Sequence, residues 1–249
     1  MSFQMRLQRE SALIHSKKLK AQQTLILEHK IFTVKKELVN ELLRIAKKKI
    51  NNDISHDFGH ACRVLGLAVK IAKEENADLD VIIPAAIFHD VLVYKGTEKY
   101  DREHEDSAVF AGKILAKMEG YPKSKIEKVS YCISVCSFSR NIKPKSIEAM
   151  ILQDADLLES TGAVAIMRTF GSSAPMHVSA FYDLKDPFST KRKPDNSRYS
   201  LDLFFTRLLK VNERIHTRTA RKIASRRKSF LKKFIKELSI EIKESDNDP

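Results

Sequence analysis

Residues 85–92 read AAIFHDVL, a stretch that sets two titratable side chains, His89 and Asp90, inside an apolar helical run. An imidazole and a carboxylate that are buried without a partner cost several kcal/mol. The pair therefore requires a hydrogen-bond network, an ion pair or a metal ion. The rest of the sequence has to supply that partner.

The composition favours an all-α protein with a large core. Of the 249 residues, 43% are hydrophobic, which is typical of a soluble globular protein. Seven glycines and long stretches of Leu, Ile, Ala, Lys and Glu favour helices over short strands joined by turns. No apolar stretch reaches the roughly 18 residues that span a bilayer, and the N-terminus has no secretory signal. We therefore expect a cytoplasmic protein that does not enter membranes.

The cysteines indicate the redox compartment, and the net charge indicates which kinds of partner the surface can attract. Cys62, Cys132 and Cys136 lack CxxC spacing, which suits small core residues in a reducing compartment. The net charge of +13 is concentrated near the C-terminus, and a basic surface attracts nucleic acid, anionic lipid or phosphorylated metabolites. Solvated helix faces are the simpler explanation of the same charge.

Helical spacing of apolar residues predicts a compact multi-helix bundle. Ser55 or Asp57 is available to cap the second helix, and Pro84 has to sit early in the third or bend it. The predicted helices span 31–50, 57–76, 79–93, 103–119, 123–138 and 146–160, with one or two more over 201–242.

The same pattern predicts how the chain is organised. Residues 1–30 are a poorly anchored basic leader, and residues 31–170 form the core. Periodicity is lost over 171–200, which predicts a long loop or insertion. Residues 201–249 are expected to form C-terminal helices that pack on the core.

Four segments of the predicted core carry unusual polar residues. Imidazole and carboxylate groups together suit a divalent transition metal, and a shell of two of each leaves coordination positions open for a nucleophilic water. Each motif alone is weak, because a helical His is more often a hydrogen-bonded residue than a ligand. The segments are SHDFGHACRV (His56, His60, Arg63), IFHD (His89, Asp90), YDREHEDSA (Asp101, His104, Glu105) and LQDADLLES (Asp154, Asp156).

The order of these motifs resembles the HD superfamily of metal-dependent phosphohydrolases, whose pattern is a His, a later His-Asp pair and a final Asp. HACRV resembles the first element, AAIFHDV the second and QDADLLESTGA the third. The resemblance, which covers roughly residues 50–170, implies that His60, His89, Asp90 and Asp156 bind one divalent ion. Manganese, magnesium, nickel, cobalt, iron and zinc all remain candidates.

Two departures from the family pattern limit the mechanism. Some relatives carry a carboxylate three or four residues after the His-Asp pair, where this chain has Val93 and Tyr94. The general acid must therefore lie elsewhere or be absent. Cys136 occupies a position that is commonly His in the branch that this chain resembles, which weakens a second-metal or phosphate contact there.

Asp90, His56 and Glu105 are the predicted catalytic residues. His56 would share a helix face with His60 and donate to a ligand or touch phosphate, but it is equally a helix-entry residue. Glu105, and His104 as a substrate contact, sit in the first turn of a helix, where acids also complement the helix dipole. Asp101 is an alternative cap for that helix.

Arg63, Lys95 and Asp154 complete the predicted substrate contacts. Arg63 offers a planar fork to phosphate, although an Arg one turn after a ligand often forms an internal ion pair. Lys95 follows the metal pair in a loop and can meet a phosphate directly, while Asp154 is an acid near the last ligand. Arg140 and His177 border loops that can close over the pocket.

The predicted function is hydrolysis of a phosphate ester or anhydride in a phosphorylated small molecule, such as a nucleotide, by metal-activated water. The first alternative is a catalytically degenerate HD fold whose basic C-terminal helices bind nucleic acid or an acidic partner. The second is an oxygen-activating diiron protein, but the spacing supplies no clear second site. The oligomeric state stays open.

Overall fold

The computed structural model describes residues 36–50, 57–94, 97–98, 100–137, 140–173 and 178–245. The predicted leader and the predicted residues His56, Lys95 and His177 lie outside this part of the chain. Within it, helices alternate with irregular segments, so the all-α prediction is confirmed. The helices are α2 (Lys36–Lys49), α3 (Phe58–Glu74), α4 (Leu79–Phe88), α5 (Glu103–Lys117), α6 (Ile126–Ser134), α7 (Ile147–Leu158), α8 (Gly162–Ser173), α9 (Asp202–Thr206) and α10 (Arg218–Ser245), with 3₁₀ turns η1 (Tyr100–Arg102), η2 (Lys123–Lys125) and η3 (Leu208–Arg214).

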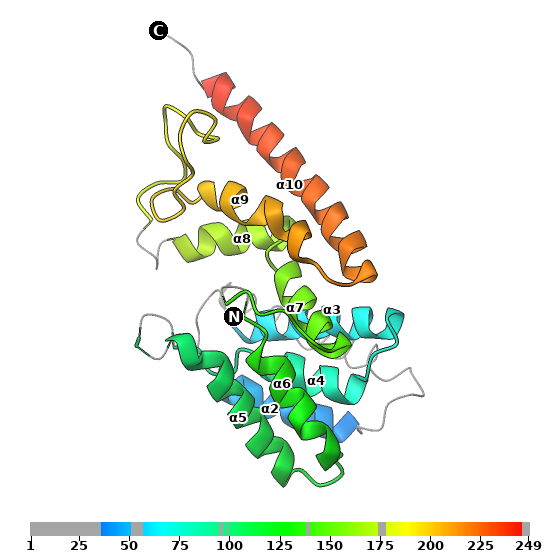
Figure 1. Ribbon diagram of the computed structural model, residues 1–249. Helices are drawn as coiled ribbons and strands as arrows, with labels where there is room; N and C mark the ends of the chain where they lie inside the picture. The colour runs from blue at the N-terminus through cyan, green and yellow to red at the C-terminus, as the bar shows by residue number, and fades with distance from the viewer. Residues whose placement is uncertain are drawn as a thin grey trace, which may run out of the picture.

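Helix α4 is the centre of the lower bundle in Figure 1, where α2, α3, α5, α6 and α7 surround it. All ten residues of α4 are buried, as its apolar sequence LDVIIPAAIF requires. The three cysteines are buried free thiols, in agreement with the prediction of small core residues. Residues 85–89 of the stretch AAIFHDVL therefore lie in the middle of the core.

Two polar caps fix where the ligand-bearing helices begin. The Asp57 carboxylate accepts a 2.7 Å hydrogen bond from the His60 backbone N–H at the start of α3. The Ser146 hydroxyl accepts a hydrogen bond from the Ala149 N–H at the start of α7. Capping satisfies backbone donors that the first helical turn leaves free. Asp57 is thus one of the two caps that the sequence predicted for this helix.

Pro84 lies inside α4, where its missing N–H frees the carbonyl of Asp80 four residues earlier. The Tyr121 hydroxyl donates a 3.0 Å hydrogen bond to that carbonyl. The helix also ends at Phe88, so the predicted span to Val93 is too long. His89 is the C-cap, and it and Asp90 follow the helix in a turn that leads out of the core.

The upper part of the molecule in Figure 1 has its own apolar cluster, formed by α8, α9, η3 and the second half of α10. The first half of α10 packs against α7 and α3, so α10 joins the two parts. Gly162, at φ 71°, begins α8 directly beneath the side chain of Arg227. A Cβ at Gly162 would lie 3.1 Å from the Arg227 Cγ, and the positive φ strains other residues.

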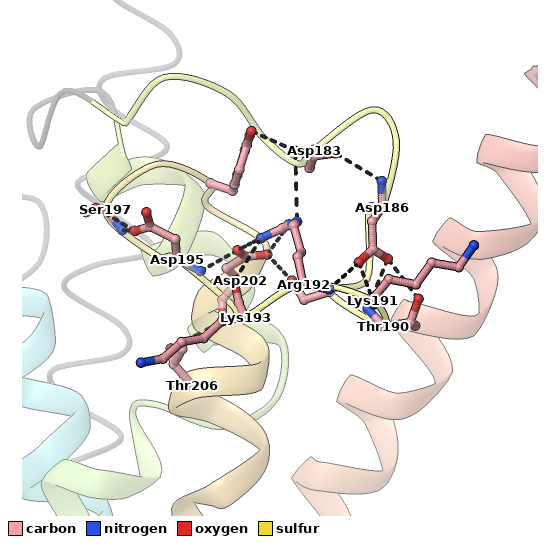
Figure 2. Close-up of polar contacts among 12 residues, drawn as sticks. Asp183, Asp186, Thr190, Lys191, Arg192, Lys193, Asp195, Ser197, Asp202 and Thr206 are labelled. Carbon is pink, nitrogen blue, oxygen red and sulfur yellow. Dashed lines mark hydrogen bonds and ion pairs between the residues drawn. The ribbon is translucent and has the colours of Figure 1, made fainter.

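Between α8 and α9, the described residues 178–201 form no helix, and α8 continues to Ser173. The buried Asp202 carboxylate holds this segment together by accepting hydrogen bonds from the Arg192 guanidinium at 2.5 and 2.9 Å and from Ser189 (Figure 2). Asp186 accepts hydrogen bonds from three consecutive backbone N–H groups, those of residues 190–192, which lowers its pKa to about 2. Carboxylates here replace the backbone pairing that a regular element would supply.

No helix in the described ranges combines the length and the apolarity that crossing a membrane requires.

Candidate metal centre

Four side chains from α3, from the turn that follows α4 and from α7 converge at one point of the lower bundle. The Nε2 atom of His60 lies 3.2 Å from the Nε2 of His89, 3.4 Å from an oxygen of Asp90 and 3.4 Å from an oxygen of Asp156. One donor atom from each of the four residues lies within 4.8 Å of every other. These are the four predicted ligands.

Each ligand is placed by the end of a helix. His60 is in the first turn of α3, His89 and Asp90 follow α4, and Asp156 is in the last turn of α7. The imidazoles of His60 and His89 are 1% and 0% exposed, whereas the carboxylates of Asp90 and Asp156 are 13% and 23% exposed. The cluster therefore has a closed imidazole side and a carboxylate side that reaches solvent.

The spacing of the donor atoms fits a divalent cation. Ligand atoms that lie about 2.1 Å from a common centre, at angles of 90–110°, are about 3.0–3.4 Å apart. The three distances from His60 Nε2 are close to that range, and the 4.0 Å from His89 Nε2 to Asp156 is somewhat longer. Two imidazoles with two carboxylates leave positions open for water and substrate oxygens.

The tautomer of His89 is fixed by the helix that carries it. Its Nδ1 lies 2.9 Å from the carbonyl oxygen of Ala86, which can only accept a hydrogen bond. Nδ1 therefore carries the proton, and the Nε2 lone pair faces the other three ligands. Complete burial lowers the pKa of His89, which favours the neutral form that binds metals.

A buried carboxylate that the sequence did not single out orients His60. The side chain of Glu159 is 1% exposed, and its Oε2 lies 3.4 Å from His60 Nδ1 and accepts a 2.7 Å hydrogen bond from Arg63 Nε. The Arg168 guanidinium lies 4.0 Å away. Glu159 follows Asp156 by three residues, so the spacing on a helix could have indicated it.

Without a bound metal, the charges around His60 and Glu159 favour the ionised forms of both side chains. Burial lowers the pKa of His60, but Asp90, Glu159 and Asp156 outweigh burial and raise it to about 9. Burial likewise raises the pKa of Glu159, but His60 and Arg63 outweigh that effect and keep it below its usual value. Glu159 therefore accepts from the His60 Nδ1–H as a carboxylate, which points Nε2 at the other ligands.

We expect Glu159→Gln to weaken metal binding about 10–100-fold without removing it, because His60 loses the charge that orients it. Metal titration followed by calorimetry measures the change. Arg63→Gln is the matched control, since it removes the other partner of the same carboxylate and should have a smaller effect. Equal metal affinity in wild type and Glu159→Gln would contradict the orienting role.

Asp154 faces the opposite side of α7 and is corrected from a substrate contact to a structural residue. Its carboxylate is 0% exposed and accepts hydrogen bonds from the backbone N–H groups of His216 and Thr217 at 2.8 and 2.7 Å, and from the Thr217 hydroxyl at 2.7 Å. Successive helical residues turn by 100°, so Asp154 and Asp156 point about 200° apart. Asp154 anchors the segment that leads into α10.

The other predicted site residues make different contacts in the structure. His104 is 12% exposed and its Nδ1 lies 3.9 Å from Asp90. Glu105, in the first turn of α5, forms an ion pair with Arg140. Arg63 forms an internal ion pair with Glu159, which was the predicted alternative to a phosphate contact. Asp101 lies in η1, and the side chain of helix α5's cap residue, Arg102, makes no capping hydrogen bond.

Comparisons with known proteins agree with this geometry. The HD domain family model matches residues 57–161. YpgQ of Bacillus subtilis is 31% identical over 194 residues, which cover 75% of this chain and 84% of YpgQ. The crystal structure of YpgQ in complex with ADP superposes with a TM-score of 0.63 at 26% identity and covers 82% of this chain and 94% of YpgQ.

A second solved structure comes from Bacillus thuringiensis and is an HD-superfamily hydrolase. It has a TM-score of 0.63 at 25% identity, and the alignment covers 84% of this chain and 98% of that one. The matched family region contains all four converging side chains. The family match, the 31% identical relative and the shared fold together show that the chain belongs to the HD-domain family.

Proposed function

We propose that the protein is a metal-dependent phosphohydrolase that cleaves a phosphate ester or anhydride of a small molecule, with nucleotides as the preferred substrate class. The observation that carries the proposal is the convergence of His60, His89, Asp90 and Asp156, with the carboxylate side open to solvent. The nucleotide class is supported by YpgQ, a relative whose structure contains ADP.

These four residues would hold one divalent cation, which lowers the pKa of water and polarises a phosphoryl oxygen when it is bound. The chain's own residues prepare the site for it. Glu159 and the Ala86 carbonyl fix the two imidazoles, and Asp90 and Asp156 supply negative charge at the open edge. His104, whose Nδ1 lies 3.9 Å from Asp90, would bind the phosphoryl group.

The test is hydrolysis by protein that has been stripped with a chelator and then reloaded with single metals. Phosphate release is measured from nucleotides and from p-nitrophenyl phosphate, while elemental analysis follows the metal. We expect activity to disappear on stripping and to return at one metal per chain. Hydrolysis that is unchanged by complete metal removal, or absent with every metal, would refute the proposal.

One observation favours a second candidate function, which is the binding of nucleic acid along α10. The helix has 28 residues, about 42 Å, and carries no acidic residue from Arg218 to Lys236. Its exposed residues over this span are mostly cations. They are Arg218, Arg221, Lys222, Arg226, Lys232, Lys233 and Lys236.

The salt dependence of the affinity tests whether the cations of α10 contact the phosphates of a nucleic acid. Each phosphate contact adds nearly one unit to the slope of log affinity against log salt on duplex DNA. We expect the triple variant Lys222→Gln, Arg226→Gln, Lys233→Gln to reduce that slope by about 2–3. An unchanged slope, or no binding at 50 mM salt, would exclude this second function and leave the hydrolase proposal untouched.

A further inference from the structure

The turn that links α7 to α8 carries two side chains of the metal centre. Asp156 lies in the last turn of α7, and Glu159, which orients His60, is the C-cap residue of that helix. The Glu159 N–H donates a 2.9 Å hydrogen bond to the carbonyl of Asp156, so the two residues share one turn of backbone. This turn leads from the lower bundle into the upper part of the molecule (Figure 1). A shift of its backbone would therefore move a candidate metal ligand and the carboxylate that orients another.

The end of α7 is an unfavourable place for a buried anion. The side chain of Glu159 is 1% exposed, and the carbonyl groups that close a helix carry partial negative charge. Both effects oppose an ionised carboxylate, so nearby cations have to offset them. Arg63 of α3 donates a hydrogen bond to Glu159, and Arg168 of α8 lies 4.0 Å from it. The upper part of the molecule thus contributes one cation to the surroundings of His60.

Arg227 of α10 contributes a second cation and holds the turn itself. Its Nη1 donates a 2.7 Å hydrogen bond to the carbonyl of Leu158, one of the last carbonyls of α7, which have no partner within their own helix. The Thr161 hydroxyl donates to the same carbonyl at 2.5 Å. Burial lowers the pKa of the Arg227 guanidinium, and the charge of Glu159 offsets part of that effect. Arg227 therefore acts on this turn through a hydrogen bond to its backbone and through attraction to its carboxylate.

Gly162 gives the side chain of Arg227 the room to reach the turn. This glycine has a φ of 71° and begins α8, directly after Thr161. A Cβ at this position would lie 3.1 Å from the Arg227 Cγ and 3.2 Å from its Cβ, closer than an ordinary contact. A larger residue at 162 would therefore displace Arg227 from the Leu158 carbonyl without removing its charge.

We propose that Arg227 is a positioning residue of the metal centre, which fixes the turn after α7 and thereby the placement of Asp156 and Glu159. The inference rests on the metal centre of the proposed function, but it needs neither the reaction nor the substrate class. Arg227 lies outside residues 57–161, the region that the HD domain family model matches. The proposal therefore gives α10 a part in the site that the matched region alone does not contain.

Charge and geometry predict opposite results when Arg227 is neutralised. The loss of a positive charge by itself makes the site more attractive to a cation. The loss of the hydrogen bond to Leu158 loosens the turn and weakens metal binding, so a lower affinity reports on position. Lys228, the next residue of α10, is the matched control for charge, because its side chain makes no hydrogen bond or ion pair with α7 within the described residues.

The experiment measures Mn²⁺ affinity by calorimetry on metal-free wild type, Arg227→Gln, Gly162→Ala, Lys228→Gln and Asp154→Ala. Asp154→Ala is the control for lost stability, because it removes the hydrogen bonds between α7 and the segment that leads into α10. Urea unfolding gives the folded fraction of each variant. The visible absorption of bound Co²⁺ is a second readout, since it depends on the arrangement of the ligands and a purely structural role would not change it.

We expect Arg227→Gln and Gly162→Ala to bind Mn²⁺ about tenfold more weakly than Lys228→Gln, at the lower end of the roughly 10–100-fold effect of losing an outer partner. The Co²⁺ spectrum should change in both. Lys228→Gln should bind at least as tightly as wild type, and folded Asp154→Ala should bind equally tightly, each with the wild-type spectrum. Equal affinities in Arg227→Gln and Lys228→Gln, or an equal loss in Asp154→Ala, would overturn the inference.

Failure of the proposed function gives different results. If wild type binds Mn²⁺ but hydrolyses no phosphate with any metal, the proposed function is refuted, and the affinities of the variants still decide the role of Arg227. If wild type binds no divalent metal, the metal centre itself is refuted, and the role of Arg227 is refuted with it.

Discussion

Asp156→Ala is expected to abolish both metal binding and hydrolysis while leaving the protein folded. The carboxylate of Asp156 lies 3.4 Å from His60 Nε2, and it is the most exposed of the four ligands, at 23%. Its removal deletes a direct ligand, so the metal affinity should fall by more than the roughly 10–100-fold loss caused by removing an outer hydrogen-bond partner. Elemental analysis and a phosphate-release assay measure the two effects.

The stability of Asp156→Ala provides the control for this prediction. A partly exposed side chain with no role in packing should change the free energy of unfolding by less than about 0.5 kcal/mol in metal-free protein. Urea titration with and without added metal separates the two contributions, because only wild type should gain stability from the metal. If Asp156→Ala kept one metal per chain and full activity, Asp156 would not be part of the site.

Asp154→Ala is expected to have the opposite phenotype, with a loss of stability of about 2–4 kcal/mol. This buried carboxylate accepts three hydrogen bonds at the junction between α7 and α10, and its removal leaves the backbone N–H groups of His216 and Thr217 without a partner. Urea unfolding monitored by circular dichroism gives the free energy of unfolding.

Asp154→Asn is the matched control for this second variant. The amide oxygen can still accept from one of the three donors, so the loss should be smaller than in Asp154→Ala. Metal bound per folded chain should stay near the wild-type value in both variants. If Asp154→Ala lost metal but kept full stability, the assignment of structural and ligand roles to the two acids would be reversed.

Local sequence patterns, with the resemblance, were sufficient to select the four side chains that converge in the structure. His60, His89, Asp90 and Asp156 follow from ligand chemistry together with the resemblance to a family pattern, and the Asp57 cap follows from short-range rules. The end of α4 was not predictable in this way, because apolar residues resume at 91–93 directly after His89 and Asp90. The hydrogen bond from His89 to the Ala86 carbonyl accompanies the end of the helix there.

Contacts between distant segments account for what the sequence did not reveal. Glu159 meets residues 96 and 99 positions away, and Asp154 meets residues 62 and 63 positions away. The partners of both acids are distant in the sequence, so the spacing of Glu159 from Asp156 was the one local signal for Glu159, and Asp154 was assigned to substrate. The resemblance already separated Asp156, as a ligand, from Asp154, and the contacts of Asp154 with His216 and Thr217 show the structural role that the sequence did not indicate.

The most direct test of the central claim is the anomalous diffraction of crystals grown with Mn²⁺. The account predicts one strong peak within about 2.0–2.5 Å of His60 Nε2, His89 Nε2 and one oxygen each of Asp90 and Asp156. A peak at any other place, or a peak here that Asp156 does not contact, would contradict it.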